Sequence, residues 1–465
     1  MKKYLLFLLG CVSILRLAAQ PHTAVANCAS PLSCTTDLRD TLYSVVNIDT
    51  LTYSYAGSNK TPGFHDVSYA DSTGCNRVTS CSSDKSILVY KVYYPSPRVF
   101  NYTDCRLPVI VLFHAGGFAD CNGNYNTTDM KTVCNDFAQR GFIAISVNYR
   151  TGVRIVPGKY GNYYSAQQML GIWRAVQDAK GAMRSIIRRE RNAKEPYRAD
   201  TNNLFVGGKS AGSVIAMNLA FYSKSNLLTT AFPGIGNSNI LGSINQNDYY
   251  GSTVIDFKIK AVLDMWGGAI VPQTTDSSYL KSPEKFFFAS GNTMPPLISF
   301  QGVKDKTFNS DYEVLNFAPA NVASGLYSSE SYCLLTATTY TPGTATNPNA
   351  WVLGAQKLYD MFKRKGIPTE LYLDCDMGHG LDSTSDFGLR TPSVNDVNNY
   401  ITQRACTFFQ AVANGIAGSL TTTRFINCEN YRHNCSVADN NNSCSNNGSC
   451  SIAVMPVYVK HTSDK

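Results

Sequence analysis

Apolar residues along the chain gather into short continuous runs, separated by stretches of helical spacing. The first four runs span residues 86–94, 107–114, 142–149 and 203–207. Between them, residues 129–140 and 166 to about 191 carry apolar side chains at the three- and four-residue spacing of an amphipathic helix. Strands that are apolar throughout are typical of a parallel sheet that is covered on both faces.

The same alternation resumes in the second half of the chain. The predicted elements there are strands at 260–266, 296–301 and 370–375 and helices at 351–365 and 394–414. Longer insertions interrupt them at 223–258, 272–295 and 307–349. We therefore predict an α/β fold with a mainly parallel sheet and helices on both faces. The insertions are expected at the carboxyl ends of the strands, where open α/β sheets bind ligands.

Both ends of the chain differ from this middle region. Two lysines precede a short apolar run and then small residues, which is the layout of a secretory signal peptide. We expect a signal peptide at residues 1–26, although cleavage near residues 18–20 is an alternative. Residues 27–427 are then one α/β domain that begins with a polar, turn-rich extension lacking a strong period. Residues 428–465 form a tail rich in asparagine, serine and cysteine.

Composition and charge exclude several classes of protein. The chain is 44% hydrophobic and 16% charged, which excludes general disorder. Its net charge of +8 is spread thinly, and its one dense basic run, residues 184–194, is expected to be a solvated helix face. Without a nucleic-acid motif beside that run, we expect no nucleic-acid binding. No later stretch is long and apolar enough for stable insertion into a membrane.

Cysteine usage agrees with export to a secreted, periplasmic or extracellular location. Of 15 cysteines, Cys11 lies in the expected signal peptide, so 14 remain. An even number in an exported protein predicts structural disulfides, whose connectivity the sequence leaves open. Because no C-x-x-C spacing occurs, we expect neither zinc nor another metal.

A candidate nucleophile lies in GGKSAG, residues 207–212, which fits the pattern G-x-S-x-G. The pattern alone is weak evidence. Here it follows an apolar strand and opens a helix-compatible run, and this strand–turn–helix context is what a nucleophile elbow requires. Side chains in place of Gly208 and Gly212 would collide with neighbouring backbone. We therefore predict that Ser210 is the nucleophile.

A serine nucleophile needs a base that takes its proton, and the base needs an orienting carboxylate. Of the six histidines, His379 lies on a glycine-bounded loop (DMGHG) just after a predicted strand. The others lie near the ends, in the extension or in the glycine motif described next. Asp305 follows a buried strand and a glycine turn between Ser210 and His379, and is the candidate acid. Asp311 is the alternative.

The segment HAGGF, residues 114–118, follows the predicted strand 107–114. Glycines there free backbone N–H groups to converge on a developing oxyanion. We predict an oxyanion hole made by Gly116, Gly117 and the N–H of Ala211, the residue after the nucleophile. A tight structural turn is the alternative explanation of the glycines.

In chain order, HAGGF, SVNYR (146–150), GGKSAG, MWGG (265–268) and GHG (378–380) match the motifs of a known family. Over residues 86–415 the chain resembles α/β-hydrolase carboxylesterases and lipases, which also share its Ser…Asp…His order. The resemblance implies an α/β-hydrolase fold. It also implies a triad of Ser210, Asp305 and His379, with Gly116, Gly117 and Ala211 as oxyanion donors and no organic cofactor.

Two further residues are candidates for substrate binding. Lys209 stands where many carboxylesterases carry an acidic residue. A cation there would favour anionic esters and disfavour the imidazolium of His379, unless the side chain points away from the pocket. Tyr160 lies in the loop after SVNYRTG and is a candidate for an aromatic pocket wall or, equally, a surface residue.

We therefore expect a secreted hydrolase of carboxylic esters, small or polymeric, that works through an acyl-enzyme. One alternative is a secreted serine peptidase of the prolyl-oligopeptidase type, against which the H-x-G-G segment argues. The other is a non-catalytic binding protein on the same scaffold, and such proteins typically lack a triad member. Acyl and alcohol specificity and oligomeric state stay open.

Overall fold

The computed structural model describes the greater part of the predicted α/β region. The described residues are 43–56, 68–71, 74–77, 86–98, 106–118, 124–151, 162–192, 195–222, 255–271, 287–288, 294–302, 305, 307–308, 312–314, 351–374, 378–380, 394–416 and 423–427.

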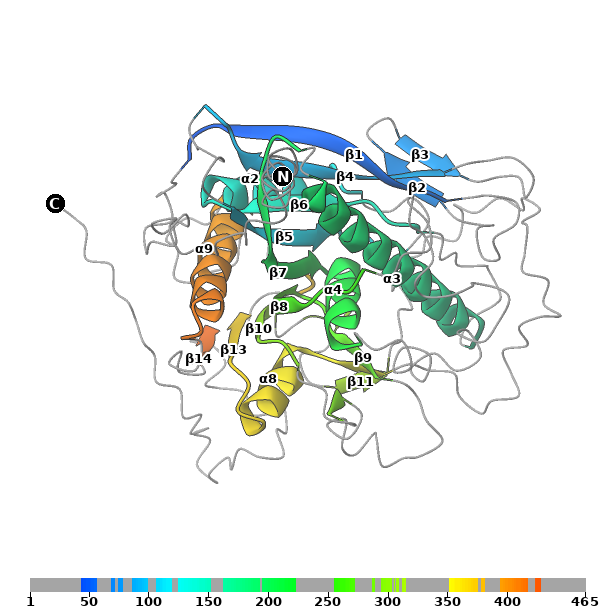
Figure 1. Ribbon diagram of the computed structural model, residues 1–465. Helices are drawn as coiled ribbons and strands as arrows, with labels where there is room; N and C mark the ends of the chain where they lie inside the picture. The colour runs from blue at the N-terminus through cyan, green and yellow to red at the C-terminus, as the bar shows by residue number, and fades with distance from the viewer. Residues whose placement is uncertain are drawn as a thin grey trace, which may run out of the picture.

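A twisted nine-stranded sheet runs through the middle of the molecule (Figure 1). Its strands are β1 (Val46–Ala56), β4 (Ser86–Pro95), β5 (Leu107–Phe113), β6 (Ile143–Val147), β7 (Ala199–Lys209), β8 (Ile259–Met265), β10 (Leu297–Gly302), β13 (Thr369–Asp374) and β14 (Thr423–Asn427). They lie in the order β1-β4-β6-β5-β7-β8-β10-β13-β14. The β1–β4 and β4–β6 pairs are antiparallel, and every pair from β6 to β14 is parallel. The predicted mainly parallel sheet is therefore confirmed.

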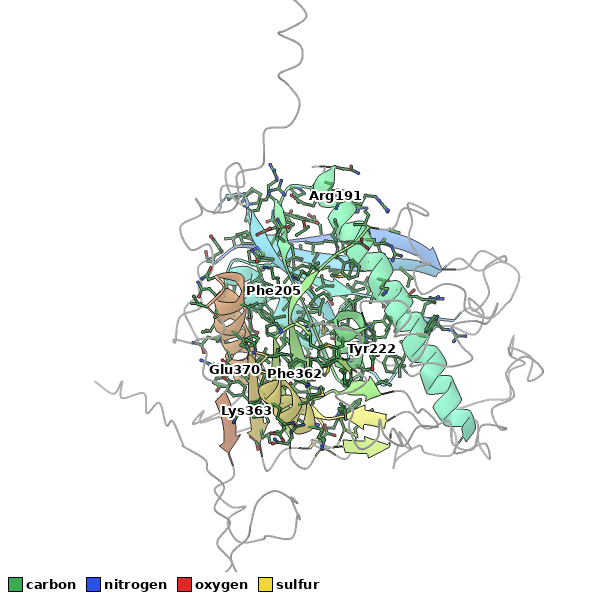
Figure 2. All side chains as sticks on the ribbon, turned by 60° about the horizontal axis from the view of Figure 1, so that its bottom comes forward. Arg191, Phe205, Tyr222, Phe362, Lys363 and Glu370 are labelled. Atoms are coloured by element: carbon green, nitrogen blue, oxygen red, sulfur yellow. The ribbon has the colours of Figure 1, made fainter. Side chains whose placement is uncertain are left out.

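Helices cover both faces of the sheet. They are α2 (Thr128–Gln139), α3 (Asn162–Arg191), α4 (Ala211–Phe221), α8 (Ala355–Arg364) and α9 (Val394–Ala413). One face packs against α2 and α9, and the other against α3, α4 and α8 (Figure 1). Aromatic side chains join the layers: Phe205 of β7 stacks on Phe409 of α9, and Phe362 of α8 packs against Phe221 of α4. Figure 2 labels Phe205 and Phe362.

The alternation of side chains explains why the strands read as unbroken apolar runs. Strand β5 is buried at all seven positions. Val109, Val111 and Phe113 point into the core beneath α3 and α4, whereas Ile110 and Leu112 point toward α2 and α9. A strand buried on both faces has no polar side to break the run.

Residues 351–353 were expected to begin a helix, and this expectation is wrong. They form β12 (Trp351–Leu353), which pairs antiparallel with β9 (Ala269–Val271) and β11 (Tyr312–Val314) in a small second sheet. Helix α8 begins only after Gly354, whose backbone is extended at the N-cap position. An aromatic and a β-branched residue favour the strand, and the glycine separates it from the helix.

Strand β1 lies in the extension that was expected to lack periodic structure. It is an edge strand with β4 as its neighbour in the sheet, and Ile48 is 52% exposed. Tyr53 is fully buried, and its hydroxyl donates to the Asn148 carbonyl at 2.6 Å. An edge strand that buries few of its side chains leaves little hydrophobic period in the sequence. A short hairpin of β2 (Ser68–Asp71) and β3 (Gly74–Arg77) follows it.

The basic run at the end of α3 was expected to be solvated, and the structure corrects this. Arg184 is only 3% exposed. Arg189 pairs with Glu195, and Glu190 pairs with Arg106, both at 2.8 Å. Among the described residues 184–192, Arg191 is the exposed cation, whereas Arg188 and Arg189 are half-buried (Figure 2). The basic side chains therefore serve mainly to hold the helix end against the protein.

Several expectations fall on other parts of the chain. The signal peptide, Tyr160 and the tail from residue 428 lie outside the described residues. Cys134 is a buried free thiol, whereas Cys406 is disulfide-bonded, so the expectation of structural disulfides is wrong for Cys134 and confirmed for Cys406. Within the described ranges, no helix is both long and apolar enough to cross a membrane.

A buried ion pair joins the end of β6 to α3. The Arg150 guanidinium and the Asp178 carboxylate lie 2.9 Å apart, with side chains 1% and 0% exposed. Replacing Asp178 by Asn leaves a buried guanidinium without its counter-charge. We expect the free energy of unfolding, measured by urea titration, to fall by about 3 kcal/mol. The exposed Asp256→Asn change is the control and should alter it by less than about 0.5 kcal/mol. Equal effects would contradict this account of the pair.

Candidate active site

Ser210 lies on the sharp turn between β7 and α4. Its backbone has φ 53° and ψ −117°, in the left-handed half of the map that non-glycine residues rarely adopt. The Ser210 N–H donates to the Met265 carbonyl at 2.9 Å, and its carbonyl accepts from the Ser213 N–H at 2.9 Å. A strained turn held in place from both sides presents the serine side chain at the carboxyl end of the sheet.

The glycines on either side of Ser210 are required by close packing. A Cβ at Gly208 would overlap the backbone of Gly212, and a Cβ at Gly212 would overlap the Phe113 carbonyl group. The start of α4 is therefore pressed against the end of β5. This contact places the turn beside the segment that begins at His114.

The structure brings together the three residues expected to form a triad. His379 Nε2 lies 2.8 Å from Ser210 Oγ, and His379 Nδ1 lies 2.9 Å from Asp305 Oδ2. The Asp305 side chain is fully buried, and that of His379 is 29% exposed. The three residues follow β7, β10 and β13, whose carboxyl ends meet at one edge because the strands are parallel. Asp311 lies outside the described residues.

The Asp305 carboxylate is oriented by its own loop. Its Oδ1 accepts the N–H groups of Thr307 and Phe308, at 2.8 and 2.9 Å, which leaves Oδ2 for the imidazole. The Phe308 carbonyl accepts from the buried Gln301 side chain at 2.5 Å. A carboxylate fixed in this way favours the His379 tautomer that has its proton on Nδ1, so that Nε2 faces the serine as an acceptor.

The HAGGF segment has an unusual backbone. Gly116, Gly117 and Phe118 all have positive φ, at 136°, 64° and 59°. A Cβ on Gly117 would meet no atom within 4 Å, so conformation rather than space calls for glycine there. The N–H of Ala211 lies at the first position of α4, where helix N–H groups are unpaired and carry partial positive charge.

His114, the first residue of this segment, is held by contacts with Tyr149 and Ala115. It is buried, its ring stacks on Tyr149 at 4.1 Å, and its carbonyl accepts from the Tyr149 hydroxyl at 2.7 Å. His114 Nδ1 lies 2.7 Å from the Ala115 carbonyl. Burial lowers the pKa of His114 to about 4. The ring is therefore neutral near pH 7, and its contacts with Tyr149 and the Ala115 carbonyl fix the start of the glycine segment.

Lys209 does not have the surroundings that an anion-binding role in the pocket requires. Its side chain is 2% exposed. The ammonium is paired with Asp129 of α2, within a short contact, and donates to Asn398 Oδ1 of α9 at 2.8 Å. The alternative considered above, that the side chain points away from the pocket, fits these contacts.

Asp264 is a buried residue near the turn that the sequence analysis missed. Its Oδ1 accepts from Ser213 Oγ at 2.5 Å and from the Gly267 N–H at 3.0 Å. Burial raises the pKa of this carboxyl to about 6. It ties the first turn of α4 to the loop after β8. The one signal in the sequence is an acidic residue inside an otherwise apolar strand, KAVLDMW.

A family model described as BD-FAE, an esterase family of the α/β-hydrolase type, matches residues 100–311. The matched stretch holds HAGGF, Ser210 and Asp305, and the sheet order and the turn at Ser210 agree with it. The chain has the α/β-hydrolase fold, and its matched stretch is similar to this esterase family.

Among solved structures, the chain is similar to a thermophilic esterase, Est2, of the Planctomycetes species Thermogutta terrifontis. The identity is 18%, over 71% of this chain and 89% of the esterase, with a TM-score of 0.40. Esterase B of Lactobacillus rhamnosis is 13% identical over 70% of this chain and 82% of its own, with a TM-score of 0.35. Neither similarity is close enough to inform the chemistry of the site. No curated protein matches the chain.

The described residues contain no group of three or more His, Cys, Asp or Glu side chains that could hold a metal ion.

The close approach at Gly212 predicts a large effect of one methyl group. In Gly212→Ala the new Cβ overlaps the Phe113 carbonyl, so α4 or β5 must shift. We expect the free energy of unfolding in urea to fall by at least about 2 kcal/mol. In the control, Gly415→Ala, the Cβ meets open space and only the positive φ of 72° opposes it, so the loss is about 1 kcal/mol. A loss in Gly212→Ala no larger than in the control would contradict the contact.

Burial of His114 predicts a pH dependence of stability. Its pKa is about 4 when folded and near 6.5 when unfolded, so the unfolded chain binds more protons between these values. The stabilisation is complete above pH 6.5 and is lost as the pH falls through about 4. We expect this residue to account for about 3 kcal/mol of that loss. Urea titrations from pH 7 to 4 should show a shallower decline for His114→Gln. An identical decline in both proteins would refute this assignment.

Proposed function

We propose that this protein hydrolyses carboxylic esters through an acyl-enzyme formed on Ser210, and that it is exported by its N-terminal signal segment. The observation that carries the catalytic proposal is the hydrogen-bonded series Ser210–His379–Asp305 at a strained turn. This is the arrangement that gives a serine hydroxyl a base and the base an orienting carboxylate.

In the acylation step, His379 Nε2 takes the proton of Ser210 Oγ as that oxygen attacks the ester carbonyl carbon. The negative charge moves to the carbonyl oxygen, which the N–H groups of Gly116, Gly117 and Ala211 receive. Asp305 Oδ2 accepts the Nδ1–H bond and stabilises the imidazolium. The tetrahedral intermediate then collapses, the ester C–O bond breaks, and His379 gives its proton to the leaving alcohol oxygen.

Deacylation repeats the sequence with water as the nucleophile. His379 Nε2 takes a proton from water as its oxygen attacks the acyl carbon, and the same N–H groups hold the second oxyanion. The proton then returns to Ser210 Oγ, and the carboxylic acid leaves. Because the His379 side chain is 29% exposed, water reaches this base without a large movement of the protein.

The two alternative functions, a serine peptidase and a non-catalytic binding protein, would use the triad residues differently. A serine peptidase would use the same triad on an amide, whose poorer leaving group depends more strongly on protonation by His379. A binding protein on this scaffold would have no need for the hydrogen bonds that join Ser210, His379 and Asp305. The family model favours the esterase among these three.

The test is hydrolysis of p-nitrophenyl esters from acetate to palmitate by the full chain. We expect Ser210→Ala to lower kcat by a factor on the order of 10⁴ or more, because the acyl-enzyme cannot form. The exposed Ser44→Ala change is the matched control and should leave kcat unchanged. The chain-length profile separates carboxylesterase from lipase activity.

The other outcomes reject the proposal. Cleavage of peptide amides with inert esters would establish the peptidase. A folded wild-type protein that cleaves neither would establish the binding protein.

A further inference from the structure

The residue before the nucleophile carries a buried positive charge. Lys209 ends β7, and alternation places it on the same face of the sheet as Phe205, which packs against α9. Its side chain therefore runs away from Ser210 and into the layer between the sheet and helices α2 and α9. At 2% exposure it has almost no contact with water.

Two helices supply the partners of this ammonium group. Asp129 lies in the first turn of α2, and Asn398 lies near the start of α9. Both side-chain oxygens accept from Lys209 Nζ, and Asn398 Nδ2 also donates to Asp129 Oδ1 at 3.0 Å. The three side chains form a closed ring of hydrogen bonds. The Trp266 ring lies against the same ammonium, with its centroid 5.4 Å from Nζ.

Each partner belongs to a part of the chain that also contributes to the active site. Helix α2 follows the HAGGF segment in the chain, and α9 follows the loop of His379. Trp266 directly follows Met265, whose carbonyl accepts from the Ser210 N–H. One ammonium group thus joins the end of β7 to the helices that follow the HAGGF segment and the His379 loop in the chain.

Because the Lys209 ammonium is buried, it depends on its hydrogen-bond partners. Burial lowers the pKa of Lys209, while the Asp129 carboxylate opposes that change and favours the charged form. A buried ammonium is tolerated only where its partners remain in place, so the ring fixes the position of Lys209. Because Lys209 is bonded directly to Ser210, a fixed Lys209 also resists relaxation of the strained turn.

We propose that Lys209 is a positioning residue for the nucleophile, which holds the Ser210 turn in register with the oxyanion segment and the His379 loop through Asp129 and Asn398. The inference rests on the proposed function. It assigns Lys209 a role in the geometry of the reaction and none in contacting the substrate.

The experiment compares Lys209→Met, Asp129→Asn and Asp129→Glu with the wild type on one p-nitrophenyl ester, at a temperature where all are folded by circular dichroism. Met keeps the length of the side chain and removes the charge. We expect kcat to fall by about tenfold to a hundredfold in Lys209→Met and Asp129→Asn, with KM within about threefold, because small displacements of reacting groups are costly. Asp129→Glu should recover most of kcat, since the Asp129 side chain is 42% exposed and has room to extend.

A matched control separates positioning from loss of stability. Glu370 is a buried carboxylate at the amino end of β13, far along the strand from the His379 loop, and it pairs with Arg404 of α9 at 3.2 Å (Figure 2). Glu370→Gln should lower the urea midpoint as Asp129→Asn does, yet leave kcat unchanged. If Glu370→Gln lowers kcat as much as Asp129→Asn, the role of Lys209 is merely structural and the inference is overturned.

The rate of labelling by a fluorophosphonate probe keeps this test independent of the substrate. The probe reports attack of Ser210 Oγ on phosphorus whether or not esters are cleaved. We expect slower labelling in Lys209→Met and Asp129→Asn, and wild-type rates in Asp129→Glu and Glu370→Gln. This result supports the inference even if no ester is cleaved and the proposed function fails. The inference is overturned if Lys209→Met and Asp129→Asn are labelled at the wild-type rate, or if the wild type is not labelled.

Discussion

The turn at Ser210 is the constraint on which the rest of the site depends. A non-glycine residue at φ 53° is unfavourable by itself, and it persists because the surrounding structure leaves no alternative. Met265 and Ser213 hold the backbone, the paired Lys209 holds the strand end, and Gly208 and Gly212 let the neighbouring segments approach. The strain is thus distributed over contacts from β5, β7, β8 and α4.

The parallel sheet turns this local geometry into a site. Because β7, β10 and β13 run in the same direction, their carboxyl ends deliver Ser210, Asp305 and His379 to one edge, although 169 positions separate the serine from the histidine. The solvent exposure of the side chains increases from Asp305 to His379. Asp305 is fully buried among N–H donors, and His379 stands at the boundary with solvent. This gradient suits a carboxylate that orients its partner and an imidazole that meets the substrate.

Most of the fold and the site residues could be predicted from the sequence, because the patterns that indicate them are local. The fold followed from apolar runs, Ser210 from its glycines, and His379 from the scarcity of histidines. The surroundings of Lys209 could not be predicted, since they depend on the phase of β7 and on Asn398, which lies 189 residues further along the chain. Asp264 was missed because its partners come from another element. Strand β12 was missed because three residues are too short for a period to emerge.

The contact between Gly212 and the Phe113 carbonyl also bears on how the protein folds. The turn cannot take its final shape until β5 and β7 are side by side, because the end of β5 forms the wall against which α4 starts. A nascent or partly unfolded chain therefore carries an ordinary serine. The strained geometry of the Ser210 turn is therefore completed only when β5 and β7 have paired in the central sheet.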